Sequence, residues 1–177
     1  HVVFASVPTG NYYVREIHPS KGYLLDEQIY PVSVSAGTTT QVHGAPVEEV
    51  PASAPGGAIV QKLDAKPGGA TQGNGSLAGA QFTVSYYGNT TGDVSGNPLR
   101  TWVFATDESG VAAYSSSQLV SGDQLFANSQ GEAVFPLGTY GITETKAPEG
   151  YALTDSSTHV AVVTLENGTA IWKSLDG

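Results

Sequence analysis

Short stretches in which apolar and polar residues alternate recur along the whole chain. Turn-forming residues separate them, among them Asp107-Glu108-Ser109-Gly110 and Asn167-Gly168. A period of two places successive side chains on opposite faces of a β-strand, and no long stretch has helical spacing. Many short strands with regular turns are typical of an all-β sandwich. The pattern predicts strands at 12–14, 30–34, 58–63, 80–87, 100–104, 139–143, 159–165 and 169–172.

One motif occurs twice. Residues 8–16 (PTGNYYVRE) align with residues 136–144 (PLGTYGITE), and the constant offset is 128 residues. The same offset aligns Gly22-Tyr23 with Gly150-Tyr151 and places Val32 and Val34 on Val160 and Val162. The repeat predicts tandem modules of similar size, the first of which contributes only its C-terminal part.

A stretch rich in Pro and Ala lies between the two copies of the motif. Its composition is typical of an extended, semi-stiff linker. We therefore predict that residues 1–45 are the C-terminal part of a first module and that residues 46–57 are a Pro-rich linker. Residues 58–177 are then the second module, and the chain ends either after or before that module's last strand.

Composition excludes several classes of function. Seven Lys and Arg against sixteen Asp and Glu give a net charge of −9, which disfavours nucleic-acid binding. The absence of Cys excludes disulfides, thiolate metal sites and Cys nucleophiles. The four histidines have no metal-ligand spacing, no phosphate loop or hydrolase triad is evident, and no apolar run is long enough to span a bilayer. We expect no cofactor, no metal and no membrane insertion.

Alternation places a carboxylate in line with apolar side chains in both copies of the motif. Glu144 shares a strand face with Tyr140 and Ile142, and Glu16 is its counterpart in the first copy. Lys62 follows a short apolar strand; Val60 shares its face, whereas Ile59 and Leu63 favour the opposite phase. If Lys62 points inward, desolvation favours a neutral, nucleophilic amine. The alternative is that Lys62 and Glu144 are ordinary exposed charges.

Two segments resemble the collagen-adhesin B-type (Cna-B, SpaA-like) modules of Gram-positive surface adhesins and pilins. Residues 139–151 (TYGITETKAPEGY) resemble the E-box of these modules, and residues 59–64 (IVQKLD) with 77–84 (LAGAQFTV) resemble their opening. Residues 7–16 with Gly22-Tyr23 are a more divergent copy. The resemblance implies an immunoglobulin-like, prealbumin-like β-sandwich.

The resemblance also implies a chemistry. The lysine of the family's first strand matches Lys62, and the E-box glutamate matches Glu144. In such modules the lysine amine attacks an Asn or Asp side chain on the last strand, the glutamate shuttles protons, and an intramolecular isopeptide bond forms once. The late acceptor candidates here are Asn167 and Asp176; otherwise the acceptor lies beyond this chain or the bond is not made. Glu16 has no matching lysine in residues 1–15.

The implied function is a structural stalk module of a Gram-positive cell-surface adhesin or pilin, not an enzyme, located at the cell wall. Its partners would be neighbouring modules or subunits. The alternative is a binding module in which exposed loops or a face containing Trp102 and Trp172 recognise a host extracellular protein or glycan. A further hypothesis is that an unreacted Lys62–Glu144 pocket accepts a strand from another molecule by β-augmentation.

Overall fold

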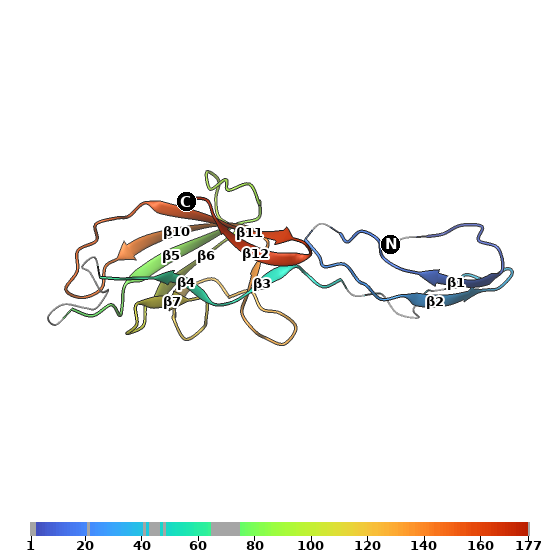
Figure 1. Cartoon of the computed structure of the whole chain (residues 1–177), viewed down its shortest axis with the longest axis horizontal. Helices are drawn as coiled ribbons and strands as arrows, with labels where there is room; N and C mark the ends of the chain where they lie inside the picture. The colour runs from blue at the N-terminus through green and yellow to red at the C-terminus, as the bar shows by residue number, and fades with distance from the viewer. Residues whose placement is uncertain are drawn as a thin grey trace. The chain divides into compact units, whose positions relative to one another are not determined.

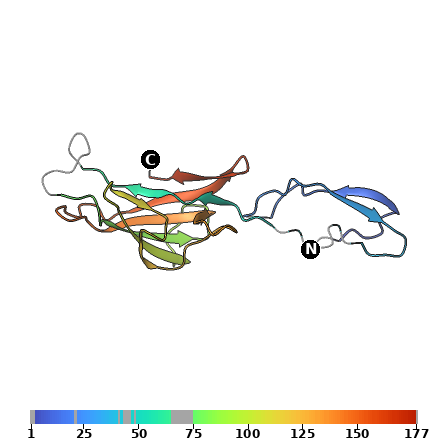
Figure 2. The same cartoon turned by 90° about the horizontal axis from the view of Figure 1, so that it is seen from below.

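A computed structural model describes residues 3–20, 22–40, 42, 47, 49–64 and 75–176. The chain divides into two compact units, which we call unit 1 (His1–Ala52) and unit 2 (Ser53–Gly177). Every regular element in the described residues is a β-strand, which confirms the all-β prediction (Figures 1 and 2). These residues include no helix long and apolar enough to cross a bilayer.

Unit 1 is built on one antiparallel strand pair. Strand β1 (Gly10–Val14) pairs with β2 (Tyr30–Val34) so that Gly10 lies opposite Val34 and Val14 opposite Tyr30. Residues 50–52, at the end of the unit, lie antiparallel to residues 22–24 and form a β-bridge between Tyr23 and Pro51. Ala52 is the only apolar side chain of the unit that is buried within its described residues. Unit 1 therefore has almost no core of its own.

Unit 2 contains the remaining strands. They are β3 (Ser53–Pro55), β4 (Ala58–Gln61), β5 (Gln81–Tyr87), β6 (Arg100–Ala105), β7 (Val111–Ala113), β8 (Leu119–Gly122), β9 (Val134–Pro136), β10 (Gly138–Lys146), β11 (Thr158–Glu166) and β12 (Thr169–Ser174). Six of them form an antiparallel sheet in the order β12-β11-β10-β5-β6-β8. The pairs β3–β9 and β4–β7 form a second, smaller layer over it (Figure 1). Unit 2 is therefore a two-layered β-sandwich.

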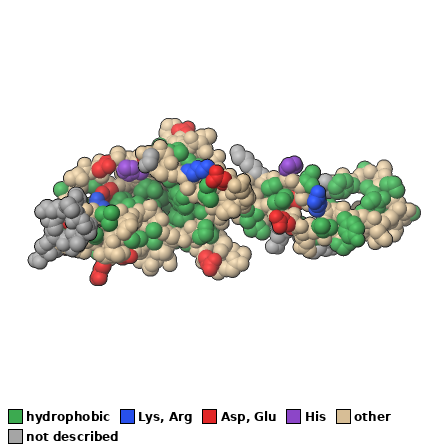
Figure 3. All heavy atoms as spheres, in the orientation of Figure 1, with side chains coloured by type: hydrophobic (Ala, Val, Ile, Leu, Met, Phe, Trp, Pro, Cys, Tyr) green, Lys and Arg blue, Asp and Glu red, His purple; other side chains and the backbone are tan. Residues whose placement is uncertain are grey.

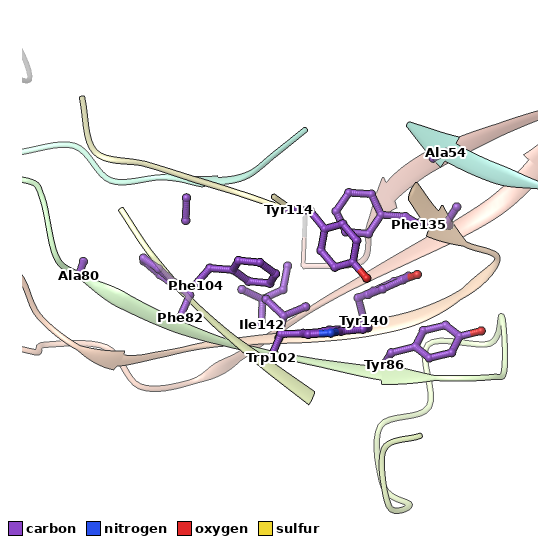
Figure 4. Packing of buried hydrophobic residues seen from close by; sticks show 13 residues of the cluster. Ala54, Ala80, Phe82, Tyr86, Trp102, Phe104, Tyr114, Phe135, Tyr140 and Ile142 are labelled. Atoms are coloured by element: carbon purple, nitrogen blue, oxygen red, sulfur yellow. The ribbon is translucent and has the colours of Figure 1, made fainter. Parts of the chain in front are cut away.

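An aromatic cluster fills the space between the layers (Figure 4). Trp102 and Tyr140 project from the six-stranded sheet toward Tyr114 and Phe135, which come from the smaller layer. The Tyr114 and Phe135 ring centroids are 4.2 Å apart, and Trp172 meets Phe135 edge-on at 4.6 Å. Large aromatic side chains bury much apolar area each, so this cluster supplies most of the core of unit 2.

The repeated motif has the same local structure in both units. The Tyr12 hydroxyl donates to the Pro8 carbonyl at 2.8 Å, and the Tyr140 hydroxyl donates to the Pro136 carbonyl at the same distance. Gly10 and Gly138, which lie between these partners, share a φ of +158°.

The constant offset fails at the second strand of the repeat. Tyr12 lies opposite Val32 in unit 1, whereas Tyr140 lies opposite Ala161 in unit 2. The prediction that Val32 and Val34 correspond to Val160 and Val162 is therefore wrong by one residue. The reason is that the connection between the paired strands is one residue longer in unit 2, and a shift of one residue moves a side chain to the other face.

The predicted linker, residues 46–57, contains paired backbone. Residues 50–52 bond to residues 22–24 in unit 1, and β3 pairs with β9 in unit 2 with Ala54 opposite Phe135. Residues 50–52 are thus held by pairing within unit 1, and residues 53–55 by pairing within unit 2. The module boundaries at 45 and 58 stay a prediction.

The two outer edges of the β4–β7 pair differ. On the β7 side, the Gln118 carboxamide accepts from the Ala113 amide and donates to the Val111 carbonyl at 2.9 Å, so a side chain occupies that edge. On the β4 side, no strand of the described part of the chain is paired. The Lys62 amide donates to the Gly110 carbonyl, so the neighbouring Gln61 amide and carbonyl point to this unpaired side.

The buried tyrosines predict a loss of stability at alkaline pH. Burial raises the pKa of Tyr114 to about 12 and raises the pKa values of Tyr86 and Tyr140 above their ordinary value. Above pH ~10 the unfolded chain releases phenolic protons that the folded chain retains, so stability falls as pH rises. We expect up to about 1.4 kcal/mol of lost stability per pH unit for each tyrosine. Urea titrations followed by Trp fluorescence at increasing pH would measure the slope.

A matched pair of variants checks that prediction. Tyr114→Phe should flatten the alkaline slope, whereas Tyr13→Phe, at an exposed position of unit 1, should leave it unchanged. Equal slopes in the two variants would contradict the assignment to buried phenols.

Candidate functional site

Lys62 and Glu144 form the one contact between oppositely charged side chains that reaches into the interior of unit 2 in the described residues. The Lys62 Nζ lies 2.5 Å from the Glu144 Oε2. The Lys62 side chain is 24% exposed and the Glu144 side chain only 9%. The structure therefore brings together two residues that are 82 positions apart in the chain.

A β-bulge explains how Lys62 comes to point inward. The pairing of β4 with β7 shifts between Ala58 and Val60, so Ile59 and Val60 both pack against the core. One extra residue in a strand interrupts the strict alternation from which the inward-facing side chains of a strand are predicted. Leu63 is exposed as a result, and the Lys62 side chain is directed toward β10. The bulge explains why, in the sequence, Val60 favours an inward-facing Lys62, whereas Ile59 and Leu63 favour the opposite face.

Strand β10 positions Glu144 in the core. Glu144 lies opposite Phe82 of β5 and follows the buried Tyr140 and Ile142 on the same strand face. Its Oε1 is buried and has no hydrogen-bond partner among the described residues. A buried polar atom without a partner is costly, so this oxygen marks a position where a donor group fits.

Sequence reasoning missed one contact that fixes the segment after Lys62. The Tyr151 hydroxyl donates to the Asp64 Oδ2 at 2.9 Å, joining the end of the E-box-like stretch to the residues that follow β4. Both residues lie in the stretches that carry the family resemblance, but no spacing rule links positions 87 residues apart.

The structure does not bring Asn167 to the Lys62–Glu144 pair. Asn167 occupies the turn between β11 and β12 with a φ of +50°. Thr143 lies opposite Thr158, so Glu144 is level with the start of β11 and Asn167 follows its far end. Ten residues of extended chain correspond to about 30 Å.

Asp176 is also engaged elsewhere. Its Oδ2 accepts from the Val160 amide at 2.8 Å and lies 3.1 Å from the His159 Nδ1. It is on the far side of β11 from β10, because β12 and its extension pair with β11. Neither acceptor candidate named from the sequence is thus adjacent to Lys62.

Glu16 in unit 1 lies two residues after the end of β1, whereas its counterpart Glu144 lies within β10. The Glu16 Oε2 accepts from the Asp26 amide at 2.8 Å. No lysine or arginine in the described residues forms an ion pair with it. In the described residues of unit 1, the carboxylate of the site therefore has no amine beside it.

The two tryptophans do not form an exposed platform. Trp102 is fully buried, and Trp172 packs against Phe135 and Tyr140. In the described part of the chain, no group of three His, Asp or Glu side chains is placed to hold a metal ion. The geometry therefore points to the Lys62–Glu144 pair as the candidate site.

Comparison with models of protein families gives a match over most of the chain. A family model described as "SpaA: Prealbumin-like fold domain" matches residues 1–45 and 66–175. These ranges include Glu16 and Glu144, whereas Lys62 lies between them. No curated protein matches the chain.

Proposed function

We propose that this chain, which belongs to the SpaA family of prealbumin-like fold domains, is a structural stalk module of a Gram-positive cell-surface adhesin or pilin. Unit 2 would be strengthened by a self-formed isopeptide bond from Lys62. The observation that carries this proposal is the contact of Lys62 Nζ with Glu144 Oε2, beside a buried Glu144 Oε1 that lacks a partner. Such modules work outside the cell, and this chain has no cysteine with which to form a disulfide.

The chemistry is a single-turnover amide exchange. The Lys62 Nζ, after giving a proton to Glu144, attacks the side-chain carbonyl carbon of an asparagine. A new C–N bond forms, the original C–N bond breaks, and ammonia leaves with a proton returned through Glu144. An aspartic acid acceptor would lose water instead. Fixed proximity in a site shielded from water supplies the acceleration.

The open side of β4 is where we place the acceptor. Lys62 directly follows β4, whose free backbone groups can bond a further strand. An acceptor residue on that strand would meet both Lys62 Nζ and the unpartnered Glu144 oxygen. Asn167 and Asp176 do not fulfil this role in the present arrangement, so the acceptor strand is a further segment or another chain.

A bond at this position has a mechanical use. Force applied along a chain opens a sandwich by separating its terminal strands, whose backbone hydrogen bonds and side-chain packing are all non-covalent. A covalent tie from the end of β4 to the acceptor strand would carry that load directly. This makes the module suited to a spacer that holds a neighbouring part of a surface protein away from the cell wall.

Mass spectrometry of the intact chain tests the proposal. The chain itself should have the full mass of its sequence. A variant extended after Gly177 by a flexible Gly/Ser linker and an alternating Val/Thr strand with one Asn should lose one ammonia, because tethering raises the effective concentration of the acceptor. The Asn would be moved to successive positions of the added strand, and peptide mapping should locate the bond at Lys62.

Three controls accompany this experiment. Lys62→Arg, Glu144→Gln and replacement of the added Asn by Ser should each abolish the mass loss. Retention of full mass at every Asn position would refute the proposed chemistry. Loss of ammonia or water from the unextended chain would refute our placement of the acceptor.

A further inference from the structure

Lys62 and Glu144 each lie where the regular pairing of their strand ends. β4 ends at Gln61, and the last backbone bond of this segment in the described residues runs from the Lys62 amide to the Gly110 carbonyl at 2.7 Å. β10 pairs with β11 only as far as Thr143, and its pairing with β5 shifts register directly after Glu144. Strand pairing alone therefore does not fix the two side chains against each other.

The contact between Tyr151 and Asp64 lies just beyond both of these ends. Asp64 follows Lys62 by two residues, and Tyr151 follows Glu144 by seven. The Tyr151 hydroxyl donates to the Asp64 Oδ2 at 2.9 Å, and both residues are half-buried. This hydrogen bond therefore joins the segment after β4 to the segment after β10, next to the Lys62–Glu144 contact.

A tight turn sets the direction of the Tyr151 side chain. The Tyr151 amide donates to the Pro148 carbonyl at 3.2 Å, and Gly150 in this turn has a φ of +85°. Glycine adopts that conformation without steric cost, so the sequence favours the turn. The backbone thus presents the Tyr151 ring to Asp64 in a defined direction.

The Lys62 side chain needs such support. It keeps 24% of its surface exposed, so water competes with Glu144 for the amino group. A lysine side chain has many rotamers, and holding it in one of them costs entropy. Its backbone is held on one side by the bond to Gly110 and on the other by the bond from Tyr151 to Asp64. Fixing the backbone on both sides limits the directions that the side chain can take.

We propose that Tyr151 and Asp64 are positioning residues: their hydrogen bond holds the amino group of Lys62 against the buried carboxylate of the site. They act through the backbone of residues 62–64 and 148–151. One consequence rests on the proposed isopeptide chemistry: the bond forms faster, because the amine stays beside its proton acceptor. The hold on Lys62 itself does not depend on whether any covalent bond forms.

Acetylation of lysines in the full chain tests this proposal. An acetyl N-hydroxysuccinimide ester reacts with neutral, accessible amines, and peptide mapping after short exposure gives the rate at each lysine. Figure 3 shows Lys and Arg side chains at only a few separate places on the visible face, which suits site-by-site mapping. Tyr151→Phe and Asp64→Ala should each raise the rate at Lys62 about tenfold, because one hydrogen bond is lost. The exposed Lys173 is the internal reference and should react at an unchanged rate.

A matched variant controls for the loss of a hydroxyl group. Tyr87 is half-buried in β5, and it lies opposite Thr139, whereas Glu144 lies opposite Phe82 near the other end of the same pairing. Tyr87→Phe should therefore leave the rate at Lys62 at its value in the parent. A rise equal to that in Tyr151→Phe would overturn the proposal.

A double variant separates positioning from general loosening. Glu144→Leu alone should raise the rate at Lys62, because the amine loses its partner. Adding Tyr151→Phe should then change the rate by less than about twofold, because two residues that act through one contact are not additive. A full tenfold rise in this background would overturn the proposal, and so would an unchanged rate in the single Tyr151→Phe variant. Trp fluorescence shows that each variant is folded, and Asp64→Ala replaces Tyr151→Phe if the latter is not.

The Asn-extended chain tests the consequence for bond formation. There, Tyr151→Phe should slow the loss of ammonia about tenfold without changing its final extent. An unaltered rate would refute this consequence. Full mass in the extended parent would refute the proposed bond, whereas the acetylation rates would still decide whether Tyr151 and Asp64 hold Lys62 in place.

Discussion

Replacing Lys62 with alanine is expected to lower the free energy of unfolding of unit 2 by about 3 kcal/mol. The variant leaves the Glu144 carboxylate buried with neither oxygen paired to a cation, since its Oε1 already lacks a partner. Removing one member of a buried pair costs about 3–5 kcal/mol, and the lower end applies because Lys62 keeps part of its surface in water. Urea unfolding followed by Trp fluorescence reports on unit 2 alone, because Trp102 and Trp172 both belong to it.

Two further variants separate burial from charge. Lys62→Met combined with Glu144→Leu should recover most of the lost stability, because an apolar pair of similar size needs no desolvated charge. Lys173→Ala breaks the exposed contact with Glu166, 3.3 Å long, and should change stability by no more than about 0.5 kcal/mol. A Lys62→Ala variant as stable as the parent would show that the pair is solvated.

Replacing Gly138 with alanine should destabilise unit 2 by about 3 kcal/mol or more. A Cβ at this position would lie 2.3 Å from Tyr86 Cε2 and 2.7 Å from the Tyr87 carbonyl oxygen. The backbone oxygen belongs to the neighbouring β5 and cannot move without disturbing its pairing with β10. The melting temperature of the variant, measured by circular dichroism, should therefore fall steeply.

Gly57 and Gly10 provide the comparison. A Cβ on Gly57 meets nothing within 4 Å, so Gly57→Ala should leave the melting temperature of unit 2 nearly unchanged. Gly10 has the φ of Gly138, but its nearest neighbour would be Tyr12 Cε2 at 3.6 Å. Crowding by β5 is thus particular to the covered copy of the motif. A Gly138→Ala variant that melts with the parent would contradict the packing described for β10 and β5.

The sequence predicted the strands and the Lys62–Glu144 site for different reasons. Alternation located most of the long strands, because each has one face in the core and a period of two follows directly. The face of Glu144 was predicted in the same way and agrees with its burial. The family resemblance then singled out Lys62, because the alternation in its own strand did not decide which way this side chain points.

What the sequence did not predict depends on contacts between distant segments. The bulge in β4 and the one-residue shift between the two copies arise from pairing partners that no local pattern specifies. The contact between Tyr151 and Asp64 joins two loops, so neither residue has a periodic signal. The positions of Asn167 and Asp176 likewise follow from the hairpin of β11 and β12, which takes both away from Lys62.

The Gln118 carboxamide has a consequence for self-association. It occupies the outer edge of β7, so the β4–β7 pair can lengthen in one direction only, past β4. Two free edges would allow one molecule to template the next without limit, as in fibrils. With the β7 edge occupied by Gln118, a further strand can pair with β4 and β7 only along β4, so a strand is added to this pair on one defined side.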